Sequence, residues 1–446
     1  MRVGQTLAVL VGATIAMSVT LVRSAQAQQA WLADRRFGEG IGIRVGNLEL
    51  HPGVAGEIGY DSNYFQRSSE TEEPIIAAYR LRVTPSISLS TLGDKRRGEA
   101  PGAPPLLNFR ASAYAGYNEL FAADSDYSDE VSGQRHIDLG VGLTLDIAPQ
   151  RPFGVDFSGD YRRVGEPSNS PNENLAFDRG SARAGVGATW RPGGGLFEWR
   201  FGYDVLYNYF EEQQYELLEN VQQTLSTRGR WRFLPRTAIV YDGSYTFIRY
   251  LLDDPFLPQN GDILRSRIGL SGLVTNRLAF MGMIGWLATF YEGVPENADT
   301  VIGQAELKYF IMPPPTIDPT AATLGLSAVA VGYTRDVANS YLAAFYQRDR
   351  VYLNFSYFFG GTVVASLEGG YSIINSPEDV EFEANQQQRL DARLFVEYRL
   401  SDVVGLNTTI RYDSSAGDSV QSVDGTAVED LDFNRWQAYL GVRVFW

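Results

Sequence analysis

The chain has two histidines, and one of them stands close to a carboxylate. His136 and Asp138 are two residues apart, so in an extended strand both side chains point to the same face. Such a pair could act as a general base with an orienting carboxylate. The sequence offers no serine nucleophile that would complete a catalytic triad. The second histidine, His51, directly precedes Pro52, where we expect a turn.

Other reaction chemistry is poorly represented. Cysteine is absent from all 446 residues, which excludes disulfide scaffolds, cysteine zinc sites and thiol nucleophiles. We find no phosphate-binding loop, helical zinc-protease motif or dinucleotide fingerprint. Aspartate and glycine occur together in loops, but without the regular spacing of a calcium loop. We therefore predict no enzymatic activity, no cofactor and no metal.

Arginines and carboxylates at alternate positions are the remaining candidates. If the strands that carry them close into a barrel, they share its inner face. These candidate pore-lining residues are Arg80, Arg82, Arg110, His136, Asp138, Asp156, Asp160, Arg183, Arg200, Asp204, Arg228, Arg230, Arg232, Asp242, Arg265, Arg267, Glu368, Asp391, Arg393, Glu397 and Arg411. Guanidinium groups bind carboxylates and phosphates bidentately, so the arginines could guide an anionic solute or polymer. Alternatively, arginines and acids pair across strands and hold a polar interior together.

Alternating polarity predicts the elements that carry these side chains. From residue 136 to 147, every odd position is Ile, Leu or Val, and the even positions are His, Asp, Gly or Thr. Residues 390–400 repeat this pattern, with Phe395 as the one exception. A period of two residues indicates β-strands with one apolar face. A single strand of this kind also fits a soluble sandwich, so the loops must discriminate.

The loops alternate in length along the chain. We expect about eighteen strands, within a range of about sixteen to twenty, with the first at 52–64, the strand that holds His136 at 131–148, and the last at 433–446. Short connections alternate with long ones, except that 93–105 and 312–321 are long where short turns are expected. Outer-membrane barrels have tight periplasmic turns, long extracellular loops and an even strand number. The sequence therefore predicts an all-β fold, a single transmembrane antiparallel β-barrel.

The N-terminal residues predict export from the cytoplasm. Arg2 provides a positive start, residues 7–22 carry no charge, and Ala25-Gln26-Ala27 offers small residues for cleavage. This is the pattern of a secretory signal peptide, although a transmembrane helix is the alternative. We expect residues 1–27 to be a signal peptide cleaved after Ala27, 28–51 a periplasmic lead-in, and 52–446 the barrel in the outer membrane of a Gram-negative bacterium.

The C-terminal strand supplies an independent indication. Trp446, Val444, Val442 and Leu440 share one apolar face, and the chain ends on an aromatic residue. Such an ending resembles the signal read by the bacterial barrel-assembly machinery. Aromatic residues near the expected strand ends are predicted to form interfacial girdles. Those expected are Tyr60, Tyr64, Phe65, Tyr117, Phe121, Tyr207, Tyr209, Tyr245, Phe247, Tyr250, Phe290 and Tyr291.

The overall composition limits the partners. With 44% hydrophobic and 20% charged residues, the chain is too apolar to be disordered. Its 38 basic residues against 53 acidic ones give a formal charge of −15, which argues against nucleic acid. Acidic side chains are concentrated in the loops expected outside the cell. We interpret them as solvated surfaces, with cation bridging to lipopolysaccharide as the alternative; outer-membrane lipid and lipopolysaccharide are expected partners.

A short segment resembles a known family. Residues 40–46, 48–54 and 59–65 read GIGIRVG, LELHPGV and GYDSNYF. They are similar to the start of the family called β-barrel porins of the second type, in which an extended lead-in reaches a proline and the first strand ends in Tyr-Asp-x-Asn. Some members accompany polysaccharide export machines. The resemblance therefore implies a conduit for a secreted polysaccharide, and a periplasmic export protein as its partner.

The predicted function is passage across the outer membrane. The first hypothesis is secretion of an exopolysaccharide or capsule, with Gln28–Leu50 and Met312–Pro319 as candidate docking surfaces for the export partner. A disordered lead-in and a stiff turn are the alternatives for these two segments. The second hypothesis is a diffusion porin for small hydrophilic or anionic solutes. A surface adhesin or structural barrel is the third hypothesis.

Overall fold

The structure is a computed structural model, and it describes most of the expected barrel. The described residues are 42–69, 74–91, 106–149, 151–165, 179–211, 213–252, 260–292, 297–311, 327–340, 345–359, 362–378, 383–417, 420–421, 427–429 and 432–446. Three predictions fall outside these residues. They concern the signal peptide with its cleavage site, residues 28–41 of the lead-in, and the Met312–Pro319 segment. Those predictions stay untested.

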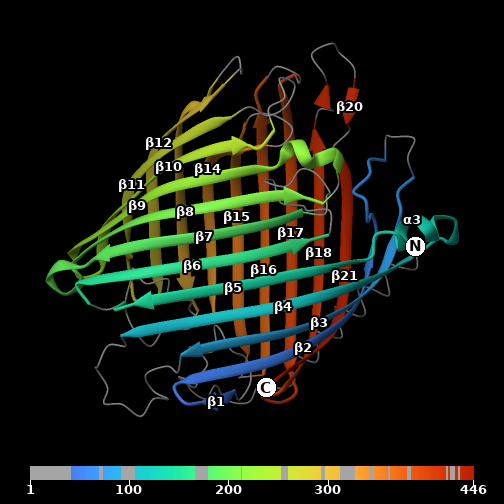
Figure 1. Cartoon of the computed structure of the whole chain (residues 1–446), viewed down its shortest axis with the longest axis horizontal. Helices are drawn as coiled ribbons and strands as arrows, with labels where there is room; N and C mark the ends of the chain where they lie inside the picture. The colour runs from blue at the N-terminus through green and yellow to red at the C-terminus, as the bar shows by residue number, and fades with distance from the viewer. Residues whose placement is uncertain are drawn as a thin grey trace.

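Eighteen strands form one closed antiparallel barrel (Figure 1). They are β2 (Leu48–Asp61), β3 (Ala78–Thr91), β4 (Leu107–Ala122), β5 (His136–Ile147), β6 (Phe153–Val164), β7 (Arg179–Trp190), β8 (Phe197–Phe210), β9 (Asn220–Leu234), β10 (Thr237–Tyr250), β11 (Gly261–Leu273), β12 (Leu278–Tyr291), β13 (Asp299–Phe310), β14 (Ala328–Asn339), β15 (Phe345–Phe359), β16 (Val363–Ser376), β17 (Asn385–Arg399), β18 (Val404–Gly417) and β21 (Phe433–Phe445). The predicted fold class is confirmed.

The barrel closes where β2 pairs with β21. Nine residue pairs join these strands, from Gly53 opposite Phe445 to Asp61 opposite Gln437. Pro52 is tolerated in β2 because its missing N–H points toward the side on which β21 has already ended. At this point the Trp446 N–H donates a hydrogen bond to the Pro52 carbonyl, with nitrogen and oxygen 2.9 Å apart. The first strand begins at Leu48, four residues earlier than predicted, and it is preceded by a hairpin with β1 (Ile43–Val45).

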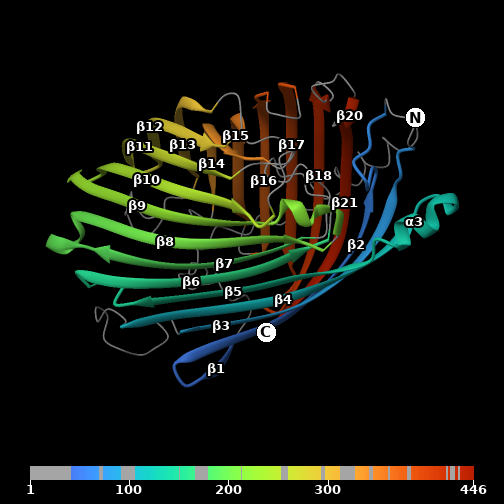
Figure 2. The same ribbon diagram turned by 45° about the horizontal axis from the view of Figure 1, so that its top comes forward.

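The two ends of the barrel differ in their connections. β1 and the C-terminus lie at the same end (Figures 1 and 2). The tight turns after β5, β7, β9, β11, β15 and β17 are at this end as well, because each of these strands runs toward it. β3 and β13 also end here, and β4 and β14 begin here, so the long connections predicted after β3 and β13 join strands at this end. Most other long loops lie at the opposite end, which agrees with the predicted asymmetry.

The outward face of the barrel is apolar. Ile58, Val141 and Ile284 leave 61%, 52% and 64% of their surface exposed, and Leu440 leaves 56%. Water-facing sheets do not present continuous apolar faces of this kind, whereas lipid-facing strands require them. Outward aromatics gather at both ends, for example Tyr60 with Tyr79 and Trp436 at one end and Trp190 with Phe197 at the other.

Three predicted girdle residues do not face lipid. Tyr250 and Tyr291 belong to a buried cluster with Ile248, Leu287 and Phe345, and the Tyr291 and Phe345 rings stack at 5.9 Å. Tyr64 is 1% exposed and packs against Ile76, Leu120 and Val131. Tyr291 directly follows Phe290, which is 52% exposed, so strand alternation places the two on opposite faces. The burial of Tyr64, which lies beyond the end of β2, depends on tertiary packing that spacing along the chain does not reveal.

A short helix replaces the predicted start of one strand. Residues 128–132 form α3 (Ser128–Ser132) at the end of the barrel opposite β1, and β5 begins at His136 instead of residue 131 (Figure 1). Asp129 and Glu130 lie in its first turn, where carboxylates favour the helix N-terminus. Val131 is fully buried against the cluster around Tyr64, so apolar burial holds the helix in place.

Glycines face aromatic rings across several strand pairs. Gly59 is opposite Tyr439, Gly140 is opposite Tyr114, and Gly332 is opposite Tyr352. A Cβ at each glycine would overlap the facing ring. The rings therefore lie flat over the neighbouring backbone and not upright in the barrel interior. This arrangement leaves room on the inner wall, where the candidate site lies.

Candidate functional site

Strand alternation places all twenty-one predicted pore-lining residues on the inner face of the barrel. Three of them are buried, and of these Arg80 borders the cavity described below, whereas His136 and Glu397, with 6% and 1% exposure, do not. Their burial is a correction to the prediction that they face a solute path. It arises because neighbouring side chains cover them, which strand alternation alone does not reveal.

Buried His136 is a structural residue. Its Nδ1 lies 2.8 Å from the Gln134 carbonyl, and its Nε2 lies 3.6 Å from Asp138. Asp138 in turn accepts hydrogen bonds from the Gly165 N–H at 3.2 Å and from Asn118 at 2.9 Å. The pair therefore joins β5 to the end of β6. His51 lies in β2 and not in a turn; it is 8% exposed, with its Nε2 3.5 Å from Glu49.

On the arc from β6 to β14, arginines and acids pair across strands. Arg200 contacts Asp156, with Nε and Oδ1 3.0 Å apart, and Arg230 lies 3.2 Å from Glu198. Asp242 accepts from both Arg228 at 3.2 Å and Arg267 at 2.9 Å. Arg265 reaches Asp336 at 2.8 Å. These contacts support the alternative in which ion pairs hold the polar interior together.

Arg393 and Arg411 differ from that arc. They are direct cross-strand partners on β17 and β18, and Glu368 is opposite Arg393 on β16. Like charges in directly opposed positions repel each other. Within the described part of the chain, neither guanidinium forms an ion pair, and the Arg411 Nε is buried without an acceptor. This pair thus provides positive charge that no described carboxylate neutralises through direct contact.

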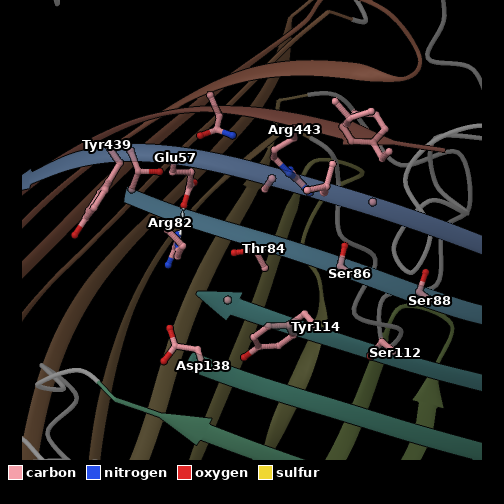
Figure 3. Close-up of a pocket in the computed structure, with 18 of the residues that line it drawn as sticks. Glu57, Arg82, Thr84, Ser86, Ser88, Ser112, Tyr114, Asp138, Tyr439 and Arg443 are labelled. Carbon is pink, nitrogen blue, oxygen red and sulfur yellow. Dashed lines mark hydrogen bonds and ion pairs between the residues drawn. The ribbon is translucent and has the colours of Figure 1, made fainter. Parts of the chain in front are cut away.

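A cavity of about 830 Å³ includes this arginine pair. Its wall comes from β16, β17, β18, β21 and β2 to β5, so it spans the closing seam of the barrel. Figure 3 shows Glu57 and Arg82 pointing toward each other across β2 and β3, with Thr84, Ser86 and Ser88 following along β3. Tyr114 and Tyr439 add aromatic surface, and hydroxyl groups line much of the remaining wall.

The two carboxylates of the cavity wall are already engaged. Glu57 accepts from the Arg82 Nε at 2.8 Å. Asp138 lies 3.8 Å from Arg80, whose Nε also donates to Asn118 at 2.8 Å. Arg443, a further wall residue, donates to buried Glu397 at 2.7 Å. Arg393 and Arg411 are therefore the wall arginines whose charge is available to a solute.

Sequence reasoning did not include several wall residues among its candidates. Phe395 was the exception to alternation on β17, and that exception is an inner-face aromatic that lines the cavity. Tyr114 and Tyr439 were not assigned to the interior, because an aromatic residue on a polar face is indistinguishable from a girdle residue by type. Strand alternation does assign Glu57 to the polar face of β2, with His51 and Asp61, and it lines the cavity.

No helix in the described ranges is long and apolar enough to cross a membrane. Among the same residues, no group of three or more histidine, aspartate or glutamate side chains could hold a metal ion.

The barrel defines the class of the chain. An even number of antiparallel strands closed on themselves, with an apolar outer face, aromatic ends and a charged inner face, is the architecture of the outer membrane of Gram-negative bacteria. The chain is an outer-membrane β-barrel protein.

Comparison with solved structures finds other barrels of this class. A BenF-like porin from Pseudomonas fluorescens Pf-5 aligns over 90% of this chain and 100% of its own, at 10% sequence identity and a TM-score of 0.47. Pseudomonas aeruginosa OpdK with vanillate aligns over 89% of this chain and 99% of its own, at 10% identity and a TM-score of 0.46. No family model and no curated protein matches. The resemblance over residues 40–65 to β-barrel porins of the second type therefore stays a prediction.

Proposed function

We propose that the protein is a diffusion channel for small anionic, hydrophilic solutes. The observation that carries this proposal is the opposed pair Arg393 and Arg411 in a cavity whose two carboxylates are bound by other side chains. Two guanidinium groups that form no ion pair with a described carboxylate attract carboxylate or phosphate groups on a passing solute. Hydroxyl and amide side chains on the same wall replace part of the solute's hydration.

Passive diffusion is favoured over polysaccharide export. Secretion of a polysaccharide through a periplasmic partner rested on the family resemblance, and the docking segments 28–41 and 312–319 lie outside the described residues. No contact within the described ranges favours a polymer over a small solute. Polysaccharide export stays a prediction of the sequence.

Swelling of proteoliposomes tests the proposal. Vesicles that contain the purified barrel are diluted into isotonic glucuronate, glucose or glucosamine, which have similar sizes and different charges. We expect glucuronate to enter fastest, and Arg393→Gln with Arg411→Gln to remove most of its advantage over glucose. Equal rates for all three solutes would contradict the preference for anions. If the vesicles do not swell, and a strain lacking the protein traps polysaccharide in its periplasm, export replaces diffusion as the function.

A further inference from the structure

Three arginines meet on the inner wall two rows beyond the cavity pair, toward the outer end of the barrel. Arg350, Ser372 and Arg389 are consecutive cross-strand partners on β15, β16 and β17. Arg348, on the same face of β15, donates from its Nε to the Ser372 hydroxyl at 3.0 Å. Ser372 is fully buried, and Arg389 is 6% exposed. Arg348 thus contacts the Ser372 hydroxyl, and Arg350 and Arg389 are the cross-strand partners of Ser372 on either side.

Only one of these arginines has a carboxylate partner that the structure places in contact. Arg350 donates to Asp391 at 2.6 Å. The Nε and Nη2 of Arg389 and the Nη2 of Arg348 are buried without a hydrogen-bond acceptor among the described residues. The Arg389 guanidinium carbon lies 5.8 Å from the centre of the Phe433 ring. A buried cation without acceptors is costly, so proteins rarely retain one without a partner.

Other buried arginines of this barrel have acceptors. Arg435 is 2% exposed, and its Nε contacts both Asp61 oxygens at 2.9 and 3.0 Å. Arg80 is 4% exposed and donates to Asn118. Arg389 therefore differs from these two equally buried arginines, although several less buried arginines of the inner wall, such as Arg411, also leave an Nε without an acceptor.

We propose that Arg348 and Arg389 hold an oxyanion, a phosphate or sulfate group, on the wall beside Ser372. A tetrahedral oxyanion presents several acceptor oxygens, which matches N–H groups that arrive from two strands. Its charge would balance the excess of guanidinium over carboxylate in this row. Because Arg389 and Ser372 are buried, the site retains its ligand, in contrast to the open cavity at Arg393 and Arg411. The proposal does not depend on the proposed function.

Thermal unfolding of the full chain in detergent tests the site, with inorganic phosphate as the probe. Unfolding is followed by loss of the compact, heat-modifiable form on gels, in phosphate or in chloride of equal ionic strength. A ligand that binds the folded state alone raises the midpoint, and we expect a rise of about 2–4 °C. Arg389→Met is expected to lose this rise while being no less stable than the wild type in chloride, because the variant buries no unpartnered charge.

Two control variants separate the site from general salt effects. Arg228→Gln removes an arginine that is 68% exposed and leaves Asp242 paired with Arg267, so the phosphate effect should persist. Arg393→Gln with Arg411→Gln should also keep it, since these residues lie outside the site. An equal rise in the wild type and Arg389→Met would reflect general stabilisation by phosphate and would overturn the proposal. If phosphate does not raise the unfolding midpoint of the wild type, the proposal is also wrong, and water molecules accept the hydrogen bonds of Arg348 and Arg389.

Discussion

At the scale of single residues, buried contacts at the seam distinguish this barrel from a sheet with two free edges. Arg435 on β21 and Asp61 on β2 form an ion pair in which both side chains are less than 5% exposed. The Gln437 amide donates to the same carboxylate at 2.7 Å. These contacts join the last strand to the first across the seam.

Removal of one seam partner should be costly. Arg435→Gln leaves the Asp61 carboxylate buried without its cation, and we expect a loss of about 3–5 kcal/mol in the free energy of unfolding. Urea unfolding in detergent measures this loss. Arg228→Gln is the matched control, because its exposed ion pair should contribute about 0–1 kcal/mol. Comparable losses in the two variants would show that the seam pair has no special role.

The glycine opposite Tyr439 permits the ring to lie flat on the wall. A methyl group at Gly59 would overlap that ring, whereas a methyl group at Gly56 on the same strand would meet nothing within 4 Å. We expect Gly59→Ala to destabilise the barrel by about 1–3 kcal/mol, as overpacking does, and Gly56→Ala to have little effect. Urea unfolding distinguishes them. Addition of Tyr439→Ala should relieve the overlap, and a failure of this rescue would contradict the account.

Sequence predicted which face these residues occupy, but not which of them pair. Period-two alternation was sufficient to place Arg228, Asp242, Arg393 and Arg411 on the inner face. Whether an arginine is opposite an acid or another arginine depends on the register between strands. Polarity alternation within one strand does not determine that register. Arg393 and Arg411 are 18 residues apart and yet directly opposed, a relation that follows from the short turn after β17 and from no local pattern.

At the scale of elements, the number and order of the strands were predictable from the sequence, and the short helix α3 before β5 was not. Tight turns and alternating polarity determine eighteen strands almost completely. The helix α3 was missed because Val131 lies in phase with the apolar residues of the following strand. Its burial against Tyr64 and Leu120 is a tertiary contact that outweighs this local pattern.

The last strand carries a prediction about assembly. Trp446 points to the lipid side and is 54% exposed, so its side chain contributes little to the folded barrel. We propose that it is part of the assembly signal with Val444, Val442 and Leu440. Deletion of Trp446 should lower the amount of heat-modifiable barrel in the outer-membrane fraction, while Trp446→Phe should not.

Stability measurements separate recognition from folding. The fraction of the Trp446 deletion variant that does assemble should unfold in urea at nearly the wild-type midpoint. If assembly and stability fall together, Trp446 acts through the folded barrel and the signal must lie elsewhere.

At the scale of the whole molecule, the inner wall has two parts with different charge balance. Between β6 and β14, Arg200, Arg265 and Arg267 contact acids on strands that lie one to three positions away in the barrel. Between β15 and β18, arginines exceed the carboxylates that they contact. The chain as a whole is acidic, with a formal charge of −15, so the net charge alone would suggest a preference for cations. The local arrangement predicts the opposite preference.

Ion selectivity in a planar bilayer tests this central claim most directly. The reversal potential of the purified barrel across a potassium chloride gradient should show that chloride passes more readily than potassium. Arg393→Gln with Arg411→Gln should move that potential toward the cation-selective side, and Arg228→Gln should leave it near the wild-type value. A cation-selective or silent wild type, or an equal shift with Arg228→Gln, would contradict the account.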